Sequence, residues 1–313
     1  MNPASTTPLS GGMRARAAGN STAPSKLLGN WQLHQPLAEG ALTKLYTARP
    51  LGCPPSWPAD YVVKVLRADM RRNPAALMAM RREAEVGRQC SHPNLVPILE
   101  THVDSDWPHI VMPRLEGASL AMVIERVGKL VVPQALWLTR QVAQALRHLH
   151  SQGWLHSDVK PANIIVSRQG HATLIDLALA MRPSDSLYSP ERPLVGTMAY
   201  VAPEMLTSTS LTHPASDIYS LGVTLYELIS GRLPFGYAEA ARLVEAHLRE
   251  VPTDLDRLDS RVPGPISDLV KRMLSKSPLR RPQSCDELID ELTDLEIETL
   301  QSRLPAEAVQ RLA

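Results

Sequence analysis

Three oxygen-bearing side chains, those of Asp158, Asn163 and Asp176, stand beside short apolar runs of the chain. Asp158 and Asn163 precede the apolar run 164–166, and Asp176 ends the next strand-like run, thirteen residues after Asn163. Carboxylate and amide oxygens suit Mg²⁺, which takes few protein ligands and keeps water and phosphate oxygens around it. The sequence therefore predicts a magnesium and phosphate site at the ends of two neighbouring strand-loop units. The alternative is a polar surface loop whose Asp and Asn residues serve only to form turns.

The chain before these residues has the pattern of a small strand-rich unit. Short segments broken by Gly and Pro predict antiparallel strands at Gln32–Glu39, Lys44–Ala48, Asp60–Leu66, Leu95–Leu99 and His109–Met112. One charged and periodic stretch, Met78–Cys90, predicts a helix that ends before His92 and Pro93. Residues 1–30 are rich in Ser, Thr, Pro and Gly, have little to bury, and predict a disordered tail.

After Gly117 the apolar residues recur about every 3.6 positions, which predicts helices. Pro133 stands at the tolerated first turn of one helix, and a capping box of Ser284 and Glu287 opens the last, which we expect to reach about Leu304. Further helices are expected at 218–230, 237–248 and 266–274. The pattern predicts an α+β protein in which a small strand-rich lobe precedes a larger helical lobe.

The composition limits the classes of partner and compartment. Lys and Arg number 33 and Asp and Glu 32, so the chain lacks the global basic charge of a nucleic-acid coat, and we expect no nucleic-acid partner. The three cysteines stand at long, unrelated spacings, which gives neither a disulfide framework nor a metal motif and fits a reducing compartment. Neither a membrane span nor a secretory signal is apparent. We therefore expect a cytoplasmic chain.

Several motifs occur together in one order along the chain. They are Tyr61-Val62-Val63-Lys64, Arg82-Glu83-Ala84-Glu85, His156 to Asn163, Asp176-Leu177-Ala178, Gly196 to Glu204, Asp217 to Gly222, and Arg281. Over about residues 31–297 the chain resembles a eukaryotic-type serine/threonine protein kinase, with the look of the bacterial members of that family. The resemblance implies a two-lobed kinase-like fold with a small antiparallel-sheet N-lobe carrying one helix (31–112), a hinge (113–117), and a larger helical C-lobe (118–297). Residues 298–313 would form a helical end and tail.

The resemblance implies a catalytic role for each matching residue. Lys64 would hold the α- and β-phosphates of ATP and be oriented by Glu83, which matches the family register better than Glu85. Asp158 would accept the proton of the substrate hydroxyl, and Lys160 would offset charge on the γ-phosphate. Asn163 and Asp176 would bind Mg²⁺.

The resemblance also implies a nucleotide site of apolar, hinge, phosphate-binding and metal-binding groups. Its expected residues are Leu37, Ala38, Gly40, Leu45, Val62, Lys64, Met112, Pro113, Leu115, Asn163 and Asp176. Met112 resembles the gatekeeper of the family. Pro113 lacks an N–H, but the family uses the carbonyl of that residue and the N–H of Leu115, so the hinge tolerates it.

The chain departs from the family pattern at three places. The phosphate-covering loop keeps only Gly40 of three expected glycines, with Ala38 and Thr43 at the others, which predicts weaker ATP affinity. Leu177 and Ala178 replace the usual Phe and Gly after Asp176, and Ala178 narrows the backbone range of the segment.

Ser157 replaces the Arg that usually precedes the catalytic aspartate and pairs with an activation-loop phosphate. Arg182 and Arg192 lie in the activation segment and are expected to be ordered only together with it. Ser184, Ser186, Tyr188 and Ser189 are candidate phosphorylation positions in the same segment.

These features predict an ATP- and Mg²⁺-dependent kinase that signals by phosphorylating protein substrates on Ser or Thr. Lys160 and Thr197 stand where serine/threonine kinases of the family have them. The lost glycines and the changed Asp176-Leu177-Ala178 segment leave open a pseudokinase that acts as a binding scaffold. A small-molecule phosphotransferase is a more distant alternative, since Gly196 to Glu204 resembles a peptide-docking element. The substrate, the regulatory input and the oligomeric state are open.

Overall fold

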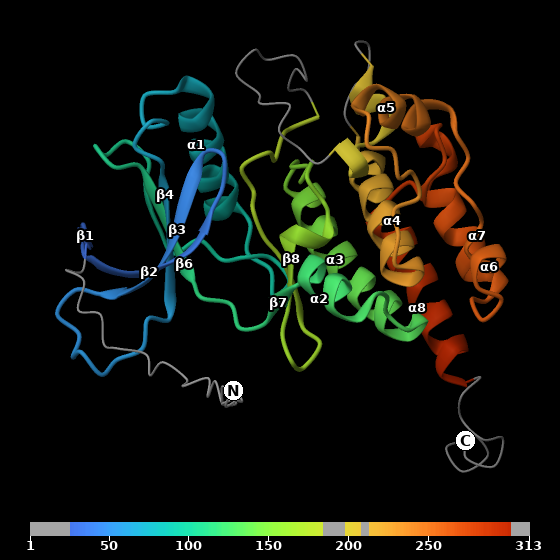
Figure 1. Cartoon of the computed structure of the whole chain (residues 1–313), viewed down its shortest axis with the longest axis horizontal. Helices are drawn as coiled ribbons and strands as arrows, with labels where there is room; N and C mark the ends of the chain where they lie inside the picture. The colour runs from blue at the N-terminus through green and yellow to red at the C-terminus, as the bar shows by residue number, and fades with distance from the viewer. Residues whose placement is uncertain (1–25, 184–197, 208–212, 302–313) are drawn as a thin grey trace, which may run out of the picture.

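The computed structural model of the chain describes residues 26–183, 198–207 and 213–301, which form two lobes (Figure 1). The first lobe is built on a six-stranded antiparallel sheet with the strand order β1-β2-β3-β4-β6-β5. Its strands are β1 (Lys26–Leu28), β2 (Trp31–Glu39), β3 (Thr43–Pro50), β4 (Tyr61–Leu66), β5 (Glu100–His102) and β6 (His109–Pro113). The sheet thus begins at Lys26, inside the range expected to be a tail, and the first 25 residues lie outside the described part.

One helix, α1 (Pro74–Gln89), packs on this sheet. Its first turn has a favourable start because the Asn73 side chain accepts the backbone N–H of Ala76 and Pro74 takes the first helical position. The helix therefore begins four residues before Met78, the expected start. Its buried face carries apolar residues and one acidic residue, Glu83.

The run Leu95–Leu99, expected to be a strand, is not one. Leu95 makes a single parallel bridge with Leu174, and the N–H of Val96 donates to the carbonyl of Leu174 over 2.9 Å. Leu95 is buried in the core of the second lobe and Val96 in that of the first. The apolar pattern of this run therefore reflects burial in both cores, which sequence periodicity cannot distinguish from a strand.

The second lobe is mainly helical. Its helices are α2 (Leu120–Val127), α3 (Val132–Ser151), α4 (Pro214–Ser230), α5 (Ala240–Arg249), α6 (Leu255–Leu258), α7 (Gly264–Met273) and α8 (Cys285–Gln301). A small antiparallel sheet contains β7 (Ala118–Ser119), β8 (Ile164–Val166) and β9 (Ala172–Leu174). Short 3-10 turns lie at Pro161–Asn163, Met198–Tyr200, Pro203–Leu206 and Pro278–Arg280.

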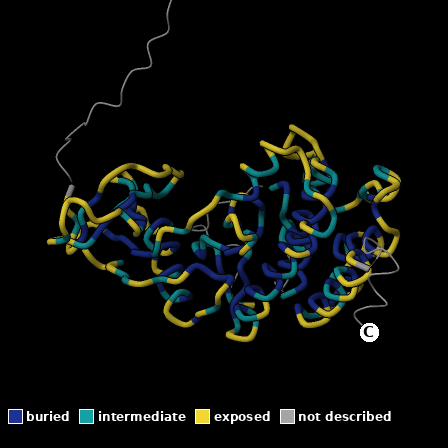
Figure 2. The backbone as a smooth tube through the Cα atoms, turned by 90° about the horizontal axis from the view of Figure 1, so that it is seen from below, coloured by how far each residue is buried: buried dark blue, intermediate teal, exposed yellow. Residues whose placement is uncertain are grey.

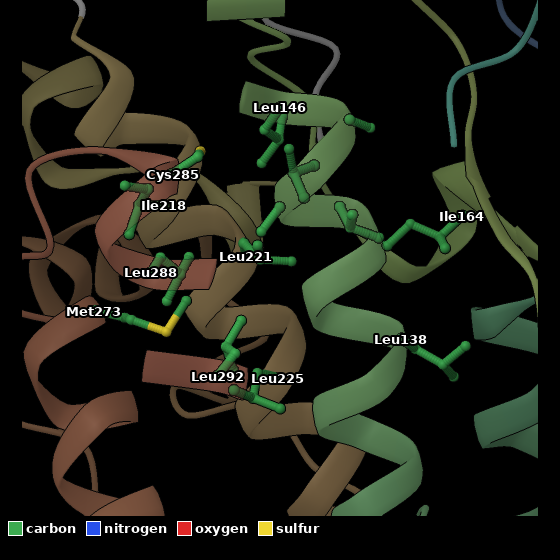
Figure 3. Close-up of a cluster of buried hydrophobic side chains, with 14 of the residues drawn as sticks. Leu138, Leu146, Ile164, Ile218, Leu221, Leu225, Met273, Cys285, Leu288 and Leu292 are labelled. Carbon is green, nitrogen blue, oxygen red and sulfur yellow. The ribbon is translucent and has the colours of Figure 1, made fainter. Parts of the chain in front are cut away.

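The core of this lobe lies between α3, α4 and α8. Figure 3 shows Leu146 of α3, Leu221 of α4 and Leu288 of α8 directed into one interior. The predicted capping of α8 is present in part: the N–H of Glu287 donates to the Ser284 hydroxyl, while the Glu287 carboxylate accepts the N–H of Gln283. Buried backbone runs through both lobes, and the exposed segments lie on the outside (Figure 2).

The two lobes are joined through a short segment after β6. The N–H of Arg114 donates to the carbonyl of Asp60 over 2.8 Å, which ties this segment to the start of β4. Gly117 has a φ of +124°, and a Cβ at this position would overlap the carbonyl oxygen of Val166. Only glycine permits this approach of the chain to β8. The α+β two-lobed architecture predicted from the sequence is confirmed. Over the described ranges, no helix combines the length and apolar character that crossing a membrane would require.

Candidate active site

The ammonium group of Lys64 lies between two carboxylates from different parts of the chain. Lys64 is in the middle of β4, where it pairs with Leu45 of β3 and Ile110 of β6. Its Nζ lies 2.7 Å from Oε2 of Glu83 and 2.8 Å from Oδ1 of Asp176. Burial alone would lower the pKa of the Lys64 ammonium, but Asp176 and Glu83 outweigh burial and raise it well above its ordinary value. Lys64 is therefore held as a cation.

Glu83 reaches Lys64 from the buried face of α1. Its side chain is only 2% exposed, and its carboxylate also accepts the backbone N–H of Leu177. Burial raises the pKa of the Glu83 carboxyl, although the charge of Lys64 opposes this shift. Glu85, two residues further on, is about half exposed and lies 3.6 Å from Arg182. The structure thus brings Glu83, and not Glu85, to the predicted lysine.

Asp176 follows β9 with a φ of +68°, an uncommon value for a residue with a Cβ. Its side chain is 40% exposed, so one carboxylate can contact Lys64 and still face solvent. Partial burial would raise the pKa of Asp176, but Lys64 lowers it below its ordinary value. Leu177 is fully buried in the same cluster as Val86 of α1. Leu177 therefore occupies the buried position after Asp176 at which the resemblance expects a phenylalanine.

The loop before β8 groups the other expected polar residues. Nζ of Lys160 lies 2.7 Å and 3.0 Å from the two carboxylate oxygens of Asp158. The amide nitrogen of Asn163 donates to the carbonyl oxygen of Asp158 and to its Oδ2, over 2.9 and 2.8 Å. Because the nitrogen of Asn163 makes these bonds, its amide oxygen is the atom suited to a metal ion.

A buried residue of α4, to which the sequence assigned no role in the site, binds the backbone of this loop. Asp217, in the first turn of α4 and only 1% exposed, accepts the backbone N–H groups of His156 and Ser157, each over 2.8 Å. Burial would raise the pKa of the Asp217 carboxyl, but its hydrogen bond with His150 lowers it below the ordinary value. Ser157 itself has a φ of +63°. The signal available in the sequence was the acidic residue that begins the motif Asp217 to Gly222.

The expected apolar wall of the nucleotide site is assembled only in part. The members brought into one cluster of the first lobe are Leu45, Val62, Met112 and Leu115, joined by Ile175. Pro113 ends β6 opposite Tyr61. Leu37 stays outside this cluster with 51% of its surface exposed, and Ala38 and Gly40 are exposed as well. The strand β2 is irregular here, since its register with β3 shifts on both sides of Pro36.

The segment that ends the activation region is anchored by a buried ion pair. The guanidinium of Arg281 makes two bonds of 2.7 Å to the carboxylate of Glu204, and the hydroxyl of Ser216 donates to the same carboxylate. Glu204 and Arg281, which belong to two separate motifs of the sequence, thus meet in space. The remaining residues singled out in this region, Gly196, Thr197, Arg192, Ser184, Ser186, Tyr188 and Ser189, lie outside the described residues.

The residues expected to bind metal are neighbours in space. The N–H of Ile175 donates to the carbonyl of Asn163 over 2.9 Å, which places Asp176 beside the end of the loop 156–163. In the described ranges no group of three or more His, Cys, Asp or Glu residues could hold a metal ion. One carboxylate and one amide oxygen fit Mg²⁺, whose remaining ligands are usually water and phosphate oxygens.

The comparisons with known proteins agree on one family. The family model described as protein kinase domain matches residues 56–292. A probable serine/threonine-protein kinase of Clostridium perfringens is 30% identical over 85% of this chain and 38% of its own length. The serine/threonine-protein kinase PknB of Mycobacterium tuberculosis is 31% identical over 85% of this chain and 43% of its own, and PrkC of Bacillus subtilis is 27% identical over 84% and 40%. The chain spans about two fifths of the length of these curated relatives. It belongs to the protein kinase domain family.

Proposed function

We propose that this chain is a serine/threonine protein kinase that uses ATP and Mg²⁺ and transfers the γ-phosphate to Ser or Thr hydroxyls of proteins. The observation that carries the proposal is the position of Lys64, with Nζ within 2.8 Å of both Glu83 and Asp176. A lysine held charged between a helix of one lobe and a loop of the other is suited to bind phosphate oxygens. The names of the relatives support the choice of Ser and Thr as acceptors.

In this proposal the phosphates of ATP contact Lys64, and Glu83 keeps the ammonium in place. Phosphoryl transfer has a loose transition state, so catalysis rests on positioning and charge compensation. Mg²⁺, when bound at Asp176 and Asn163, supplies charge compensation on the phosphate oxygens. The partly exposed carboxylate of Asp176 keeps the negative charge that such an ion requires, because Lys64 lowers its pKa.

Asp158 is the group proposed to receive the substrate hydroxyl. Its carboxylate already accepts hydrogen bonds from Lys160 and Asn163, which fix its orientation. The hydroxyl oxygen of Ser or Thr would be aimed at the γ-phosphorus and lose its proton to Asp158 as the new O–P bond forms. The bond between the γ-phosphorus and the bridging oxygen of the β-phosphate breaks in the same step, and ADP leaves with that oxygen. Lys160 would then move from Asp158 toward the γ-phosphate, whose negative charge it offsets.

The direct test is phosphotransfer from labelled ATP to a generic protein substrate and to proteins of a lysate, with and without Mg²⁺. We expect transfer by the wild-type chain, loss of at least about 100-fold (~2.7 kcal/mol in barrier) in Asp158→Ala and Asp176→Ala, and no transfer without a divalent ion. Asp290→Ala, which removes an exposed acidic residue of α8, is the matched control and should retain activity. Equal transfer by wild type and Asp158→Ala would contradict the proposal.

A thermal-shift titration separates the kinase from a pseudokinase scaffold. A ligand that binds only the folded state raises the melting temperature, and the rise grows with the logarithm of the ligand concentration above Kd. We expect ATP with Mg²⁺ to stabilise the wild type and to stabilise Lys64→Met less. Stabilisation without any turnover would favour the scaffold.

A further inference from the structure

Trp154 lies two residues before His156 and is surrounded by two arginines. Arg182 lies over its ring with Cζ 4.2 Å from the centroid, and Arg82 of α1 lies at 5.8 Å. The indole N–H of Trp154 donates to Oε1 of Gln89, over 2.9 Å. Trp154 is only 1% exposed, so these contacts replace solvent around a large aromatic side chain.

The two arginines also make contacts between the lobes. Arg82 donates from Nη1 to the carbonyl of Ala180 over 3.1 Å, and Nη2 of Arg182 lies 3.6 Å from Oε1 of Glu85. Leu155 and Met181 exchange two backbone hydrogen bonds of 2.8 and 2.9 Å, which fix the strand-like segment 180–182 beside Trp154. Arg182 was expected to be ordered only with the activation segment, but it is held on Trp154 and α1.

The α1 residues in these contacts lie on one face of the helix. Arg82, Glu85 and Gln89 are spaced by three and four positions, which places them above one another along α1. Glu83 directly follows Arg82 and extends from the adjacent face to Lys64. A contact that fixes Arg82, Glu85 and Gln89 therefore also fixes the rotation of α1 and its distance from β4.

We propose that Trp154 and Arg182 are positioning residues that hold α1 where Glu83 meets Lys64, so that this chain assembles its site without a phosphate on the activation segment. The proposal rests on the proposed kinase function for its effect on catalysis, while its structural part concerns α1 alone. A cation on an aromatic face and a buried indole N–H bond are interactions that need no modification to form. Ser157 stands where the resemblance expects an arginine that would pair with a phosphate. In this chain the contacts of Arg182 and Trp154 connect α1 to the region after Asp176 without such a phosphate.

The first experiment compares hydrogen exchange of α1 in the full chain and in Arg182→Gln. The matched control is Arg242→Gln, which removes a similarly exposed arginine that lies over Tyr237 and pairs with Glu245. We expect amides of residues 82–90 to exchange at least about threefold faster in Arg182→Gln and unchanged in Arg242→Gln. This readout needs no phosphotransfer, so it decides the proposal even if the wild type proves inactive. Equal exchange in the two variants would overturn it.

The second experiment measures kcat and the KM for ATP in a double-mutant cycle with Glu83→Gln. Arg182→Gln alone should lower kcat/KM for ATP about tenfold, Arg182→Lys should lose less than threefold, and Arg242→Gln should match the wild type. In the Glu83→Gln background, Arg182→Gln should add less than twofold, because both changes disturb the same contact with Lys64. A full tenfold further loss there, or no loss in Arg182→Gln alone, would show that Arg182 does not act through Glu83. Trp154→Leu should lower kcat/KM in the same way, alone and in the Glu83→Gln background. The result for Arg182→Gln decides the proposal, because the side chain of Arg182 is partly exposed and can be changed without leaving a cavity in the core.

Discussion

The carboxylate of Asp217 accepts the backbone N–H of Ser157 over 2.8 Å, across 60 residues of sequence. The same carboxylate accepts the N–H of His156 and pairs with Nε2 of His150. Three bonds to one buried carboxylate fix the backbone of the loop 156–163 where Ser157 takes its positive φ. The loop is thus held from α4, and the side chain of Ser157 need not take part.

The first prediction concerns activation-loop phosphate. A hydrogen bond to a charged group contributes about 1.5–3 kcal/mol, and the neutral hydroxyl of Ser157 cannot supply the cation for one. We therefore expect a variant with Ser184, Ser186 and Ser189 all changed to Ala to keep its rate within a few-fold of wild type, before and after phosphatase treatment. A loss of tenfold or more (~1.4 kcal/mol in barrier) in either comparison would contradict this independence.

The second prediction concerns Asp217. Asp217→Asn turns one acceptor toward the loop into a donor, so at least one buried N–H of His156 or Ser157 loses its partner. We expect a loss of about 1–3 kcal/mol in the free energy of unfolding and at least a tenfold fall in kcat. Denaturant unfolding and steady-state kinetics measure the two effects. Asp290→Asn, at an exposed position of α8, is the control, and an equal response of both variants would count against the role of Asp217.

The third prediction separates two glutamates of α1. Glu83→Gln removes the buried partner of Lys64, and we expect phosphotransfer to fall about 100-fold (~2.7 kcal/mol). Glu85→Gln removes only an exposed ion pair with Arg182, and such pairs contribute about 0–1 kcal/mol. Its activity should fall by less than fivefold. Comparable losses in both variants would mean that Glu83 does not orient Lys64.

The fourth prediction is a pH dependence of stability from Glu204. Burial would raise the pKa of its carboxyl, but Arg281 outweighs burial and lowers it below the ordinary value of 4.5. Folding thus favours the ionised form, so the contribution is present at neutral pH and is lost as pH falls below about 4.5.

Glu204→Gln should cost about 3–5 kcal/mol at pH 7, since it leaves Arg281 buried without its partner charge. The difference from wild type should shrink as the pH approaches 3. Urea unfolding at several pH values gives both quantities, and a difference that stays constant across this range would argue against the pair as its source.

The fifth prediction concerns Gly40. A Cβ there would meet the carbonyl oxygen of Thr43 at 3.8 Å, an ordinary contact, and its φ is not positive. Gly40→Ala should therefore leave the melting temperature within about 2 °C, while the added methyl group hinders the approach of phosphate to the backbone. We expect the KM for ATP to rise several-fold with little change in kcat. An unchanged KM would show that this turn does not contact the phosphates.

Much of the site was predictable because its residues stand in short motifs. The spacing of Asp158, Lys160 and Asn163 lies within one loop, and the structure brings these side chains into direct contact. Glu83 was preferred to Glu85 by its match to the family register, and in the structure Glu83 lies on the buried face of α1 while Glu85 is about half exposed. The sequence did not indicate that the register of β2 with β3 shifts on both sides of Pro36, next to the exposed Leu37, whose contact with the nucleotide stays a prediction. A register shift depends on the neighbouring strand, which no local pattern records.

The sequence by itself determined which groups are available for chemistry and in which order the strands and helices follow, because motifs, caps and periodicity are local properties of the chain. The tertiary structure alone decided which distant groups meet. Asp217 supports Ser157, Arg182 lies over Trp154, and Leu95 and Val96 separate into two cores. The first two contacts form because a buried polar or aromatic group requires a partner, and Leu95 and Val96 separate because each buries an apolar side chain in a different core. None of the three is recorded in a local pattern of the sequence.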